Sequence, residues 1–480
     1  MKASLIACVC LATLTWAQSE GASSTAQLIF TNVNVVNTRD GEVSRNMTVL
    51  VSDGKIQKVA KIGLIGSGRN IRVVNAAGKY LIPGLWDMHV HTGGAEPWDE
   101  RIIYPLYVAN GVTAVRDMSG DTDELEARRD QIERGHLIGP HLFLGGPFVD
   151  DASYNDPFTL ATPEDAPSAL DASVRHGADF VEVSANLSRS SYLAIAREAT
   201  KRKLRMAGQV PVEVSVSEAS ASGQRSIEHL AGMALACSSR ENELRNRELQ
   251  ALATHNMTAF VAAHQQAIGT YDAKKASSLF MELSMNNTWQ VPTLVWSEAR
   301  AATTRADLSA LPQLKYVPAA VREHWATARN SSQGQLSLLK QQALQNRDLV
   351  TTMRRAGVQF MAGSGGPAPY IFPGSSLHDE LELLVKTGFT PLQALQAATF
   401  NPALFMVKLD KYGVVEKGHV ADLVLLEANP LDDISNTRKI DSVVMQGNYY
   451  SREDLDRMLA GVAALAREQA VAGNSRESSE

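Results

Sequence analysis

The chain has 480 residues, of which 44% are hydrophobic and 20% are charged, an ordinary composition for a globular protein with a large core. Its 46 Lys and Arg residues and 52 Asp and Glu residues give a net charge of -6. Because the sequence is mildly acidic and has no basic run, we do not expect it to bind nucleic acid. The expected partner is a small molecule, and the composition leaves homo-oligomer formation open.

Residues 1–17 have the order of an export signal. Lys2 precedes an apolar run, Ala3–Leu14, and Thr15-Trp16-Ala17 follows, ending on a small residue. The run is too short to span a bilayer. The pattern predicts a cleaved signal peptide, a secreted or periplasmic protein, and no membrane attachment after cleavage. Cleavage would leave Cys237 as the last cysteine, which excludes an internal disulfide framework.

Both ends of the remaining chain are rich in short β-branched segments with Asp-Gly or Gly-containing turns between them. This pattern is typical of small β-sheets. The segments are QLIFTNVNVVN, MTVLVSDGKIQKVA and IRVVNAAGKYL near the start, and VEKGHVADLVLLEANP and KIDSVVMQGNYYS near the end. We therefore predict a small discontinuous β-sandwich domain built from residues 26–80 and 408–450.

The middle of the chain, residues 81–407, alternates apolar strand-like segments with helix-like segments. Such alternation indicates an α/β protein made of parallel βα units. The expected strands cover residues 81–91, 111–118, 141–146, 178–184, 205–210, 225–230, 289–296 and 358–365. Eight strands predict a (β/α)8 TIM barrel. Residues 451–480 are predicted to form a C-terminal helix over 451–470 and a disordered tail over 473–480.

Two histidines end the first expected strand of this barrel. Barrel enzymes carry their chemistry at the C-terminal ends of the strands. His89 and His91 are separated by one residue, so on a strand both side chains lie on the same face and can share a cation. The preceding stretch IPGLWD makes this His-x-His pair far more specific than the pair alone.

Several longer stretches resemble the amidohydrolase superfamily, in its imidazolonepropionase-like and prolidase-like branch. They are LIPGLWDMHVHT, NGVTAVRDM, GADFVEVS, GQRSIEHL, FPGSSLHDELELLVKTGFTPLQALQAATFNPA and GHVADLVLLEANPLDDISNTRKIDSVV. The resemblance runs from about Ile29 to Tyr449. It implies a barrel whose mouth holds two metal ions, bound by the His-x-His pair, a carboxylated Lys, two further His and an Asp. His229 in SIEHL matches one of those histidines.

Three positions depart from the pattern that the resemblance implies. Glu182 stands at the lysine position, Gln209 at a histidine position and Gly365 at the position of the Asp that binds metal and accepts a proton. An amide oxygen is a poor substitute for imidazole on zinc, and glycine offers no ligand or base. We therefore expect a reduced, mononuclear site for Zn2+ or another divalent metal. Its predicted ligands are His89, His91, Glu182 and His229.

The resemblance also implies which residues act in catalysis and in substrate binding. The predicted catalytic residues are His229, His378 and Glu182, and the predicted substrate-binding residues are Gln209, Tyr370 and His378. Surrogate bases for the missing Asp could come from Glu96, Asp99, Asp150, Asp151 or Asp379, although loop carboxylates are usually solvated. Glu228 adjoins His229, so strand alternation predicts that its side chain points away from the mouth and is structural.

The leading hypothesis is an exported hydrolase that uses a metal-activated water to cleave an ester bond or a C–N bond other than a peptide bond in a small molecule. Two alternatives stay open, because fold alone does not determine function. One is a non-hydrolytic or metal-free enzyme, such as a lyase, isomerase or cyclase. The other is a pseudoenzyme or binding protein that keeps the pocket.

Overall fold

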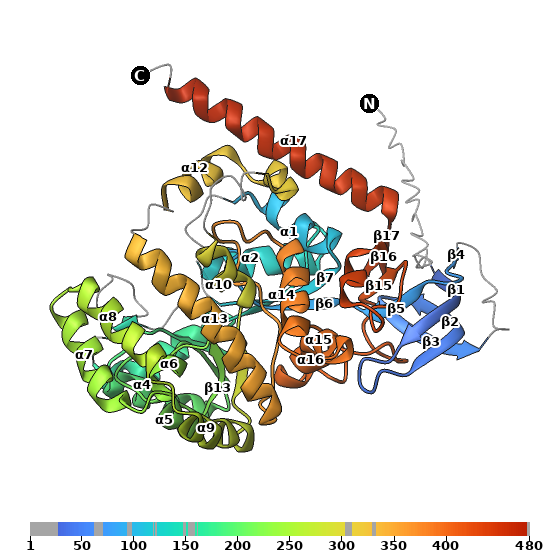
Figure 1. Ribbon diagram of the computed structural model, residues 1–480. Coiled ribbons are helices and arrows are strands. Elements are labelled where there is room, and N and C mark those ends of the chain that lie inside the picture. Colours follow the sequence, from blue (N-terminus) through green and yellow to red (C-terminus); the bar gives the residue numbers. More distant parts are fainter. Residues whose placement is uncertain are drawn as a thin grey trace, which may run out of the picture.

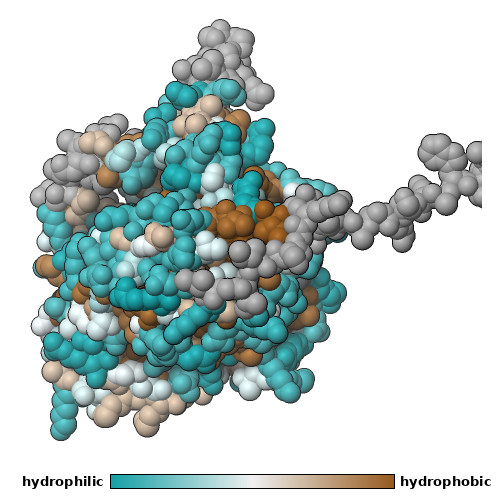
Figure 2. All heavy atoms as spheres, turned by 90° about the vertical axis from the view of Figure 1, so that its right-hand side faces the viewer, coloured by the Kyte–Doolittle hydropathy of each residue, from teal (hydrophilic) through white to brown (hydrophobic). Residues whose placement is uncertain are grey.

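The computed structural model describes residues 27–61, 71–93, 98–118, 120, 122–146, 150–151, 159–160, 162–302, 310–328 and 333–477 (Figure 1). The predicted signal peptide, residues 1–17, lies outside these residues. Within the described ranges, no helix is long and apolar enough to cross a membrane. The face seen in Figure 2 is mostly hydrophilic, with one clear hydrophobic area.

Strands from both ends of the chain pair in one eight-stranded mixed sheet, in the order β17-β16-β15-β5-β1-β2-β3, with β4 beside β1. The strands are β1 (Gln27–Val36), β2 (Val43–Ser52), β3 (Lys55–Lys61), β4 (Ile71–Asn75), β5 (Tyr80–Pro83), β15 (Leu423–Leu426), β16 (Ile440–Met445) and β17 (Asn448–Ser451). Blue and red strands accordingly lie side by side in Figure 1. Phe30, Val49, Ile56 and Leu423 form a separate core against this sheet.

The middle of the chain forms two parallel sheets, one of three strands and one of four. The first contains β6 (Leu85–Val90), β7 (Val112–Asp117) and β8 (His141–Leu144), and the second contains β11 (Val181–Val183), β12 (Met206–Gly208), β13 (Gln224–Glu228) and β14 (Trp289–Val291). A short parallel pair, β9 (Asp150–Asp151) and β10 (Thr159–Leu160), lies outside both. Seven of the eight expected strand positions therefore hold parallel strands, so this part of the chain has the predicted α/β class.

Individual backbone hydrogen bonds connect the two parallel sheets at both junctions. On one side, the amide of Asp179 donates to the carbonyl of Leu144 at 2.8 Å. On the other side, the eighth expected segment lies between β14 and β6 without being a strand. Met361 donates to Gln290 at 3.0 Å, and Met88 donates to Ala362 at 2.9 Å. Strand ladders alone therefore do not form one closed eight-stranded sheet.

The first expected strand is divided between two sheets at Gly84. β5 before it belongs to the mixed sheet, whereas β6 after it belongs to a parallel sheet. A Cβ atom added at Gly84 would lie 2.0 Å from Thr113 Oγ1, so this close approach requires a glycine. The continuous strand predicted over 81–91 was wrong, because a run of apolar residues does not reveal a change of pairing partner.

Helices follow most of the parallel strands. They are α1 (Glu100–Ala109), α2 (Thr122–Glu133), α3 (Ala166–Arg175), α4 (Arg189–Arg202), α5 (Val216–Ala221), α6 (Met233–Ala236), α7 (Glu241–Ala253), α8 (Met257–Gly269), α9 (Ala273–Met285), α10 (Leu294–Ala301), α12 (Ala319–Ala328), α13 (Gln333–Arg355), α14 (Ser375–Lys386), α15 (Pro391–Ala397) and α16 (Phe400–Phe405). Short 3-10 turns are η1 (Pro163–Asp165), η2 (Pro312–Tyr316) and η3 (Ile434–Arg438).

The C-terminal helix α17 (Arg452–Glu477) lies across α1 and α12 (Figure 1). Its buried residues Leu455, Val462 and Ala466 are seven and four residues apart, so they share one helix face and join the main core. The helix extends to Glu477, so it is longer than the predicted range 451–470 and enters the stretch for which a disordered tail was expected.

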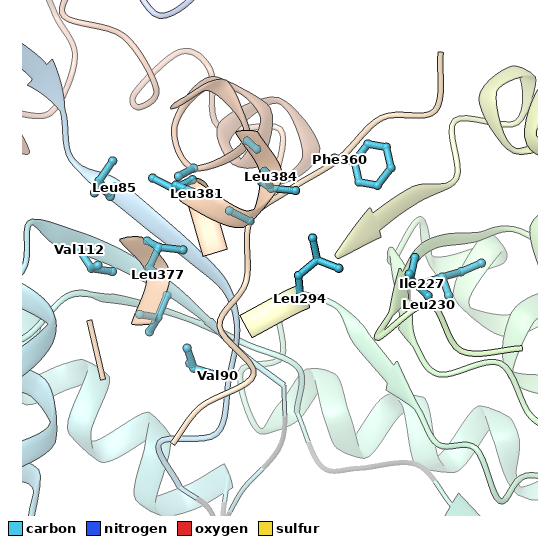
Figure 3. Close-up of a cluster of buried hydrophobic side chains, with 14 of the residues drawn as sticks. Leu85, Val90, Val112, Ile227, Leu230, Leu294, Phe360, Leu377, Leu381 and Leu384 are labelled. Atoms are coloured by element: carbon cyan, nitrogen blue, oxygen red, sulfur yellow. The ribbon is translucent and has the colours of Figure 1, made fainter. Parts of the chain in front are cut away.

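The largest hydrophobic core joins the parallel strands to the helices that cover them. Figure 3 shows Leu377, Leu381 and Leu384 of α14 beside Leu85 and Val90 of β6. The three leucines share one helix face because they are three and four residues apart. This contact holds α14 against the strand that carries the two predicted metal-binding histidines.

Replacing Gly208, the last residue of β12, with Ala is expected to destabilise the fold. Its φ of +130° is unfavourable for residues with a side chain, and an added Cβ would lie 2.2 Å from the carbonyl oxygen of Val183 on β11. We expect Gly208→Ala to lower the free energy of unfolding by about 1–3 kcal/mol, measured by denaturant titration. Gly78→Ala, at φ +78° with open space around it, is the control and should have the smaller effect. Equal losses in the two variants would contradict the role of crowding.

Candidate functional site

His89, the fifth residue of β6, is held at both ring nitrogens. Nδ1 lies 2.9 Å from Glu228 Oε2, and Nε2 lies 3.1 Å from His91 Nε2. An ionised carboxylate only accepts hydrogen bonds, so Nδ1 carries the proton and the lone pair of Nε2 faces His91. His89 is 2% exposed, whereas His91 is partly exposed. A carboxylate behind a histidine in this way fixes the tautomer of a metal ligand or a base.

Glu228 also forms a fully buried ion pair. Arg116 on β7 donates from Nη2 to Glu228 Oε1 at 2.7 Å and from Nε to the carbonyl of Met88 at 2.7 Å. Both charged side chains are 0% exposed, and the Ser226 hydroxyl donates to the same carboxylate oxygen of Glu228. Because the two groups compensate each other away from water, the pair holds the carboxylate in place behind His89.

His229 comes directly after β13 and lies beside His89, with 4.3 Å between the ring centroids. Its φ of +57° is left-handed, and its amide donates to the carbonyl of Val291 at 2.9 Å. The ring Nδ1 lies 2.6 Å from Thr293 Oγ1, and that hydroxyl donates to the Pro292 carbonyl at 2.9 Å. Thr293 Oγ1 therefore accepts a hydrogen bond from Nδ1–H, which leaves a lone pair on Nε2.

Burial determines the protonation of this cluster. It lowers the pKa of His89 well below its usual range, and the neighbouring His91 and Arg116 lower it further. Burial also lowers the pKa of His229 well below its usual range. Conversely, burial raises the pKa of Glu182 well above its usual range, and repulsion from Glu228 adds to this shift. The two histidines are therefore neutral near pH 7, and Glu182 favours its neutral acid form.

Trp296 stands beside the position where the resemblance predicts the missing Asp. An added Cβ at Gly365 would lie 3.3 Å from Trp296 Cβ, and φ at this glycine is +75°. The Trp296 ring lies over His229, with centroids 4.7 Å apart and an interplanar angle of 32°. A side chain at Gly365 would thus be strained and would press against the indole.

The predicted substrate-binding residues are dispersed. Gln209 follows β12 and is half-buried, and its backbone N–H donates to the Val183 carbonyl at 3.1 Å. The Tyr370 ring packs 5.7 Å from Trp325. His378 is buried in α14, where Nε2 lies 3.0 Å from the Asn110 carbonyl and Nδ1 lies 2.9 Å from Thr437 Oγ1.

His378 therefore uses both ring nitrogens to connect helices. Both ring nitrogens are thus occupied, which conflicts with the catalytic and substrate-binding roles predicted for His378. The sequence showed its position after the eighth strand segment, but not the direction in which its side chain points from the helix. Among the surrogate bases, Asp99 caps α1 by accepting from the Arg101 amide at 2.8 Å, and Asp379 pairs with Arg438. Glu96 and the side chains of Asp150 and Asp151 lie outside the described residues.

Glu228 was expected to be structural, with its side chain turned from the mouth; it does form a buried ion pair with Arg116, and its carboxylate also contacts His89 at 2.9 Å. β13 ends at Glu228 and His229 has a left-handed backbone, so strand alternation does not continue between them. Arg116 and Thr293 were missed from the sequence as parts of the site. A charged Arg116 inside the apolar strand GVTAVRDM was the signal available, because a buried cation requires a buried anion.

A two-metal centre does not fit these residues. In the part of the chain that the structure describes, no group of three or more His, Cys, Asp or Glu side chains converges on a common point. His89 and His91 supply two imidazole nitrogens, which are suitable donors for a single cation. Both imidazoles are directed at each other by Nε2, and two nitrogens about 2.0–2.1 Å from one tetrahedral ion are about 3.3 Å apart.

The comparisons with known proteins agree with this fold. Residues 80–449 match the family model described as the amidohydrolase family, so the chain belongs to this family. It is 26% identical over 438 residues to the ochratoxinase of Aspergillus niger, covering 82% of this chain and 80% of the relative.

Two solved structures show the same fold. A bottromycin amidohydrolase has a TM-score of 0.70 at 21% identity, covering 91% of this chain and 90% of the other. An Xaa-Pro dipeptidase with bound methionine has a TM-score of 0.65 at 19% identity, covering 89% of this chain and 100% of the other.

Proposed function

We propose that this protein is a hydrolase that cleaves an amide or ester bond of a small molecule at the cluster of His89, His91 and His229. The observation that carries the proposal is the orientation of His89, whose Nδ1 is bound to the buried Glu228–Arg116 pair and whose Nε2 faces His91 at 3.1 Å. Membership of the amidohydrolase family supports it, as do relatives named for amide hydrolysis. The bond is an ester or a C–N bond other than a peptide bond.

A single divalent cation, such as Zn2+, would be held by His89 and His91, whereas His229, predicted from the sequence as a further ligand, would serve as the base. Bound there, it would polarise the substrate carbonyl and acidify water. The chain itself supplies the orientation of both imidazoles. The lone pair of His229 Nε2 can accept the proton that a water loses on attacking the carbonyl carbon, and can return it to the departing amine or alcohol. Thr293 keeps the proton of Nδ1 in place during this exchange.

The metal-free enzyme is the second candidate, and one observation favours it. The 3.1 Å between His89 Nε2 and His91 Nε2 also suits a hydrogen bond, so Glu228, His89 and His91 would form a carboxylate-imidazole-imidazole relay. In that case His91, the partly exposed member, would exchange protons with the substrate.

The proposal extends to the barrel, to a separate domain and to export. We infer that the two parallel sheets and the segment 359–366 form the family's TIM barrel, which the hydrogen bonds at both junctions support. The mixed sheet would be a separate domain, and residues 1–17 would direct export. The substrate is a small molecule.

Elemental analysis and a substrate panel test the function. We expect about one zinc ion per full-length chain after incubation with zinc and gel filtration, and hydrolysis of amides or esters. His89→Asn should lose the ion and lower kcat/KM by about 100-fold, in the range typical of losing one catalytic interaction. His255→Asn, an exposed histidine outside the cluster, is the control.

The outcomes separate the candidates. Hydrolysis without stoichiometric metal would contradict the single-ion site and support the imidazole relay. No hydrolysis across a broad panel of amides and esters would overturn the proposed function itself.

A further inference from the structure

A polar groove lies between helices α8 and α13, which pack beside each other (Figure 1). Its volume of about 480 Å³ is typical of a small-molecule site. Gln341, Gln345, Asp348 and Thr352 line it from α13 at three- and four-residue intervals, so they form one helix face. At about 1.5 Å per residue this face is about 16 Å long. The described residues that line the groove do not include the histidines of the cluster, so it is distinct from the proposed catalytic site.

Gln345, near the middle of this face, has an amide without a partner. The side chain is buried, with 8% exposed. Among the described residues, neither its Nε2 nor its Oε1 has a hydrogen-bond partner. Buried amides are nearly always hydrogen-bonded, because the loss of their water is costly without a replacement. The amide therefore offers a donor and an acceptor, side by side, to a molecule in the groove.

The other polar groups of the groove are neutral, except for one carboxylate. Gln265 on α8 and Gln341 on α13 add two further amides. Asp348 is exposed and is the single charged residue among the described ones that line the groove. An ionised carboxylate only accepts hydrogen bonds, so Asp348 requires donors from a ligand and repels a second negative charge.

An aromatic ring and aliphatic side chains form the apolar part of the groove. Tyr271 is 41% exposed, Leu344 is 60% exposed and Ile268 is half-buried. The Tyr271 hydroxyl lies beside that of Thr352, which donates to the carbonyl of Asp348 at 2.8 Å. These contacts restrict the Tyr271 side chain, so its ring is prepared to pack against the C–H groups of a ligand.

We propose that this groove binds a neutral carbohydrate of about the size of a disaccharide. Each sugar hydroxyl is both a donor and an acceptor, so neighbouring hydroxyls can satisfy both amide atoms of Gln345 and donate to Asp348. The C–H face of a sugar ring would pack on Tyr271. A wholly aliphatic ligand would leave the Gln345 amide unpaired, and an acidic sugar would be repelled by Asp348. The proposal does not depend on the hydrolase function.

Calorimetric titration of the full-length protein with cellobiose, maltose and N,N'-diacetylchitobiose tests the proposal, with digalacturonate as the acidic comparison. We expect at least one neutral disaccharide to bind, and digalacturonate to bind about 10-fold more weakly or not at all. Gln345→Leu should weaken the binding about 10-fold, the effect of losing two neutral hydrogen bonds. Tyr271→Ala should also weaken it. Denaturant unfolding checks the fold, and Gln345→Leu should be no less stable than the wild type, because it removes an unpaired amide.

Gln131→Leu on α2 replaces an exposed glutamine outside the groove and is the matched control. His89→Asn should also bind the disaccharide as the wild type does, because His89 does not line the groove. No binding of the three neutral disaccharides at millimolar concentration would overturn the proposal, as would binding that Gln345→Leu leaves unchanged or that His89→Asn abolishes. Equally tight binding of digalacturonate would overturn the preference for a neutral ligand and with it the proposal.

Discussion

Arg116→Met is expected to lower the free energy of unfolding by about 3–5 kcal/mol, because it leaves the carboxylate of Glu228 buried without its counter-ion. Arg116 and Glu228 are both 0% exposed, so water cannot replace the lost bonds. The variant would also lose the 2.7 Å bond from Arg116 to the Met88 carbonyl, next to His89. Denaturant unfolding followed by circular dichroism at neutral pH measures the loss.

Two further variants make this result specific. Arg116→Met combined with Glu228→Gln removes the uncompensated charge, so it should recover part of the stability. Arg134→Met breaks an exposed pair with Asp130, whose atoms are 2.8 Å apart, and should change stability by less than about 1 kcal/mol. A loss in Arg116→Met as small as that in Arg134→Met would show that the buried pair does not stabilise the fold.

The same cluster shows how far the sequence could predict the site. His89, His91 and His229 were identified from their positions at strand ends, and the structure brings these three together. Their supporting residues could not be predicted, because they depend on details that the pattern of apolar residues does not contain. The contact of Glu228 with His89 was not expected, since strand alternation was continued past the end of β13.

The fold shows the same limit. The α/β class and seven of the strand positions followed from alternating apolar and helical segments, since each unit buries its own face. The change of sheet at Gly84 depends on its close approach to Thr113, where an added Cβ would lie 2.0 Å from Oγ1, and the bonds of His378 depend on how α14 packs on α1 and η3. Both are tertiary contacts between segments far apart in the chain.

Glu380 on α14 should make stability depend strongly on pH. It is fully buried, and Oε2 accepts from the Val295 amide at 2.8 Å, at the start of the helix that carries Trp296 and Arg300. Burial raises the pKa of Glu380 from 4.5 to about 8. Between these values the unfolded chain releases the proton while the folded protein keeps it, so stability falls as pH rises. At about 1.4 kcal/mol per pH unit, the loss from this group is of the order of 5 kcal/mol, complete above pH 8.

Glu380→Gln removes this titration and keeps an oxygen that can accept from the Val295 amide. We expect the variant and the wild type to be similarly stable near pH 5, and the variant to be the more stable by several kcal/mol near pH 9. Denaturant unfolding at pH 5, 7 and 9 measures the difference. Glu323→Gln replaces an exposed carboxylate on α12 and should follow the wild-type curve. If the Glu380→Gln and wild-type curves are parallel across this range, the folded protein does not hold a proton on Glu380, and its carboxylate must be compensated at the start of α10.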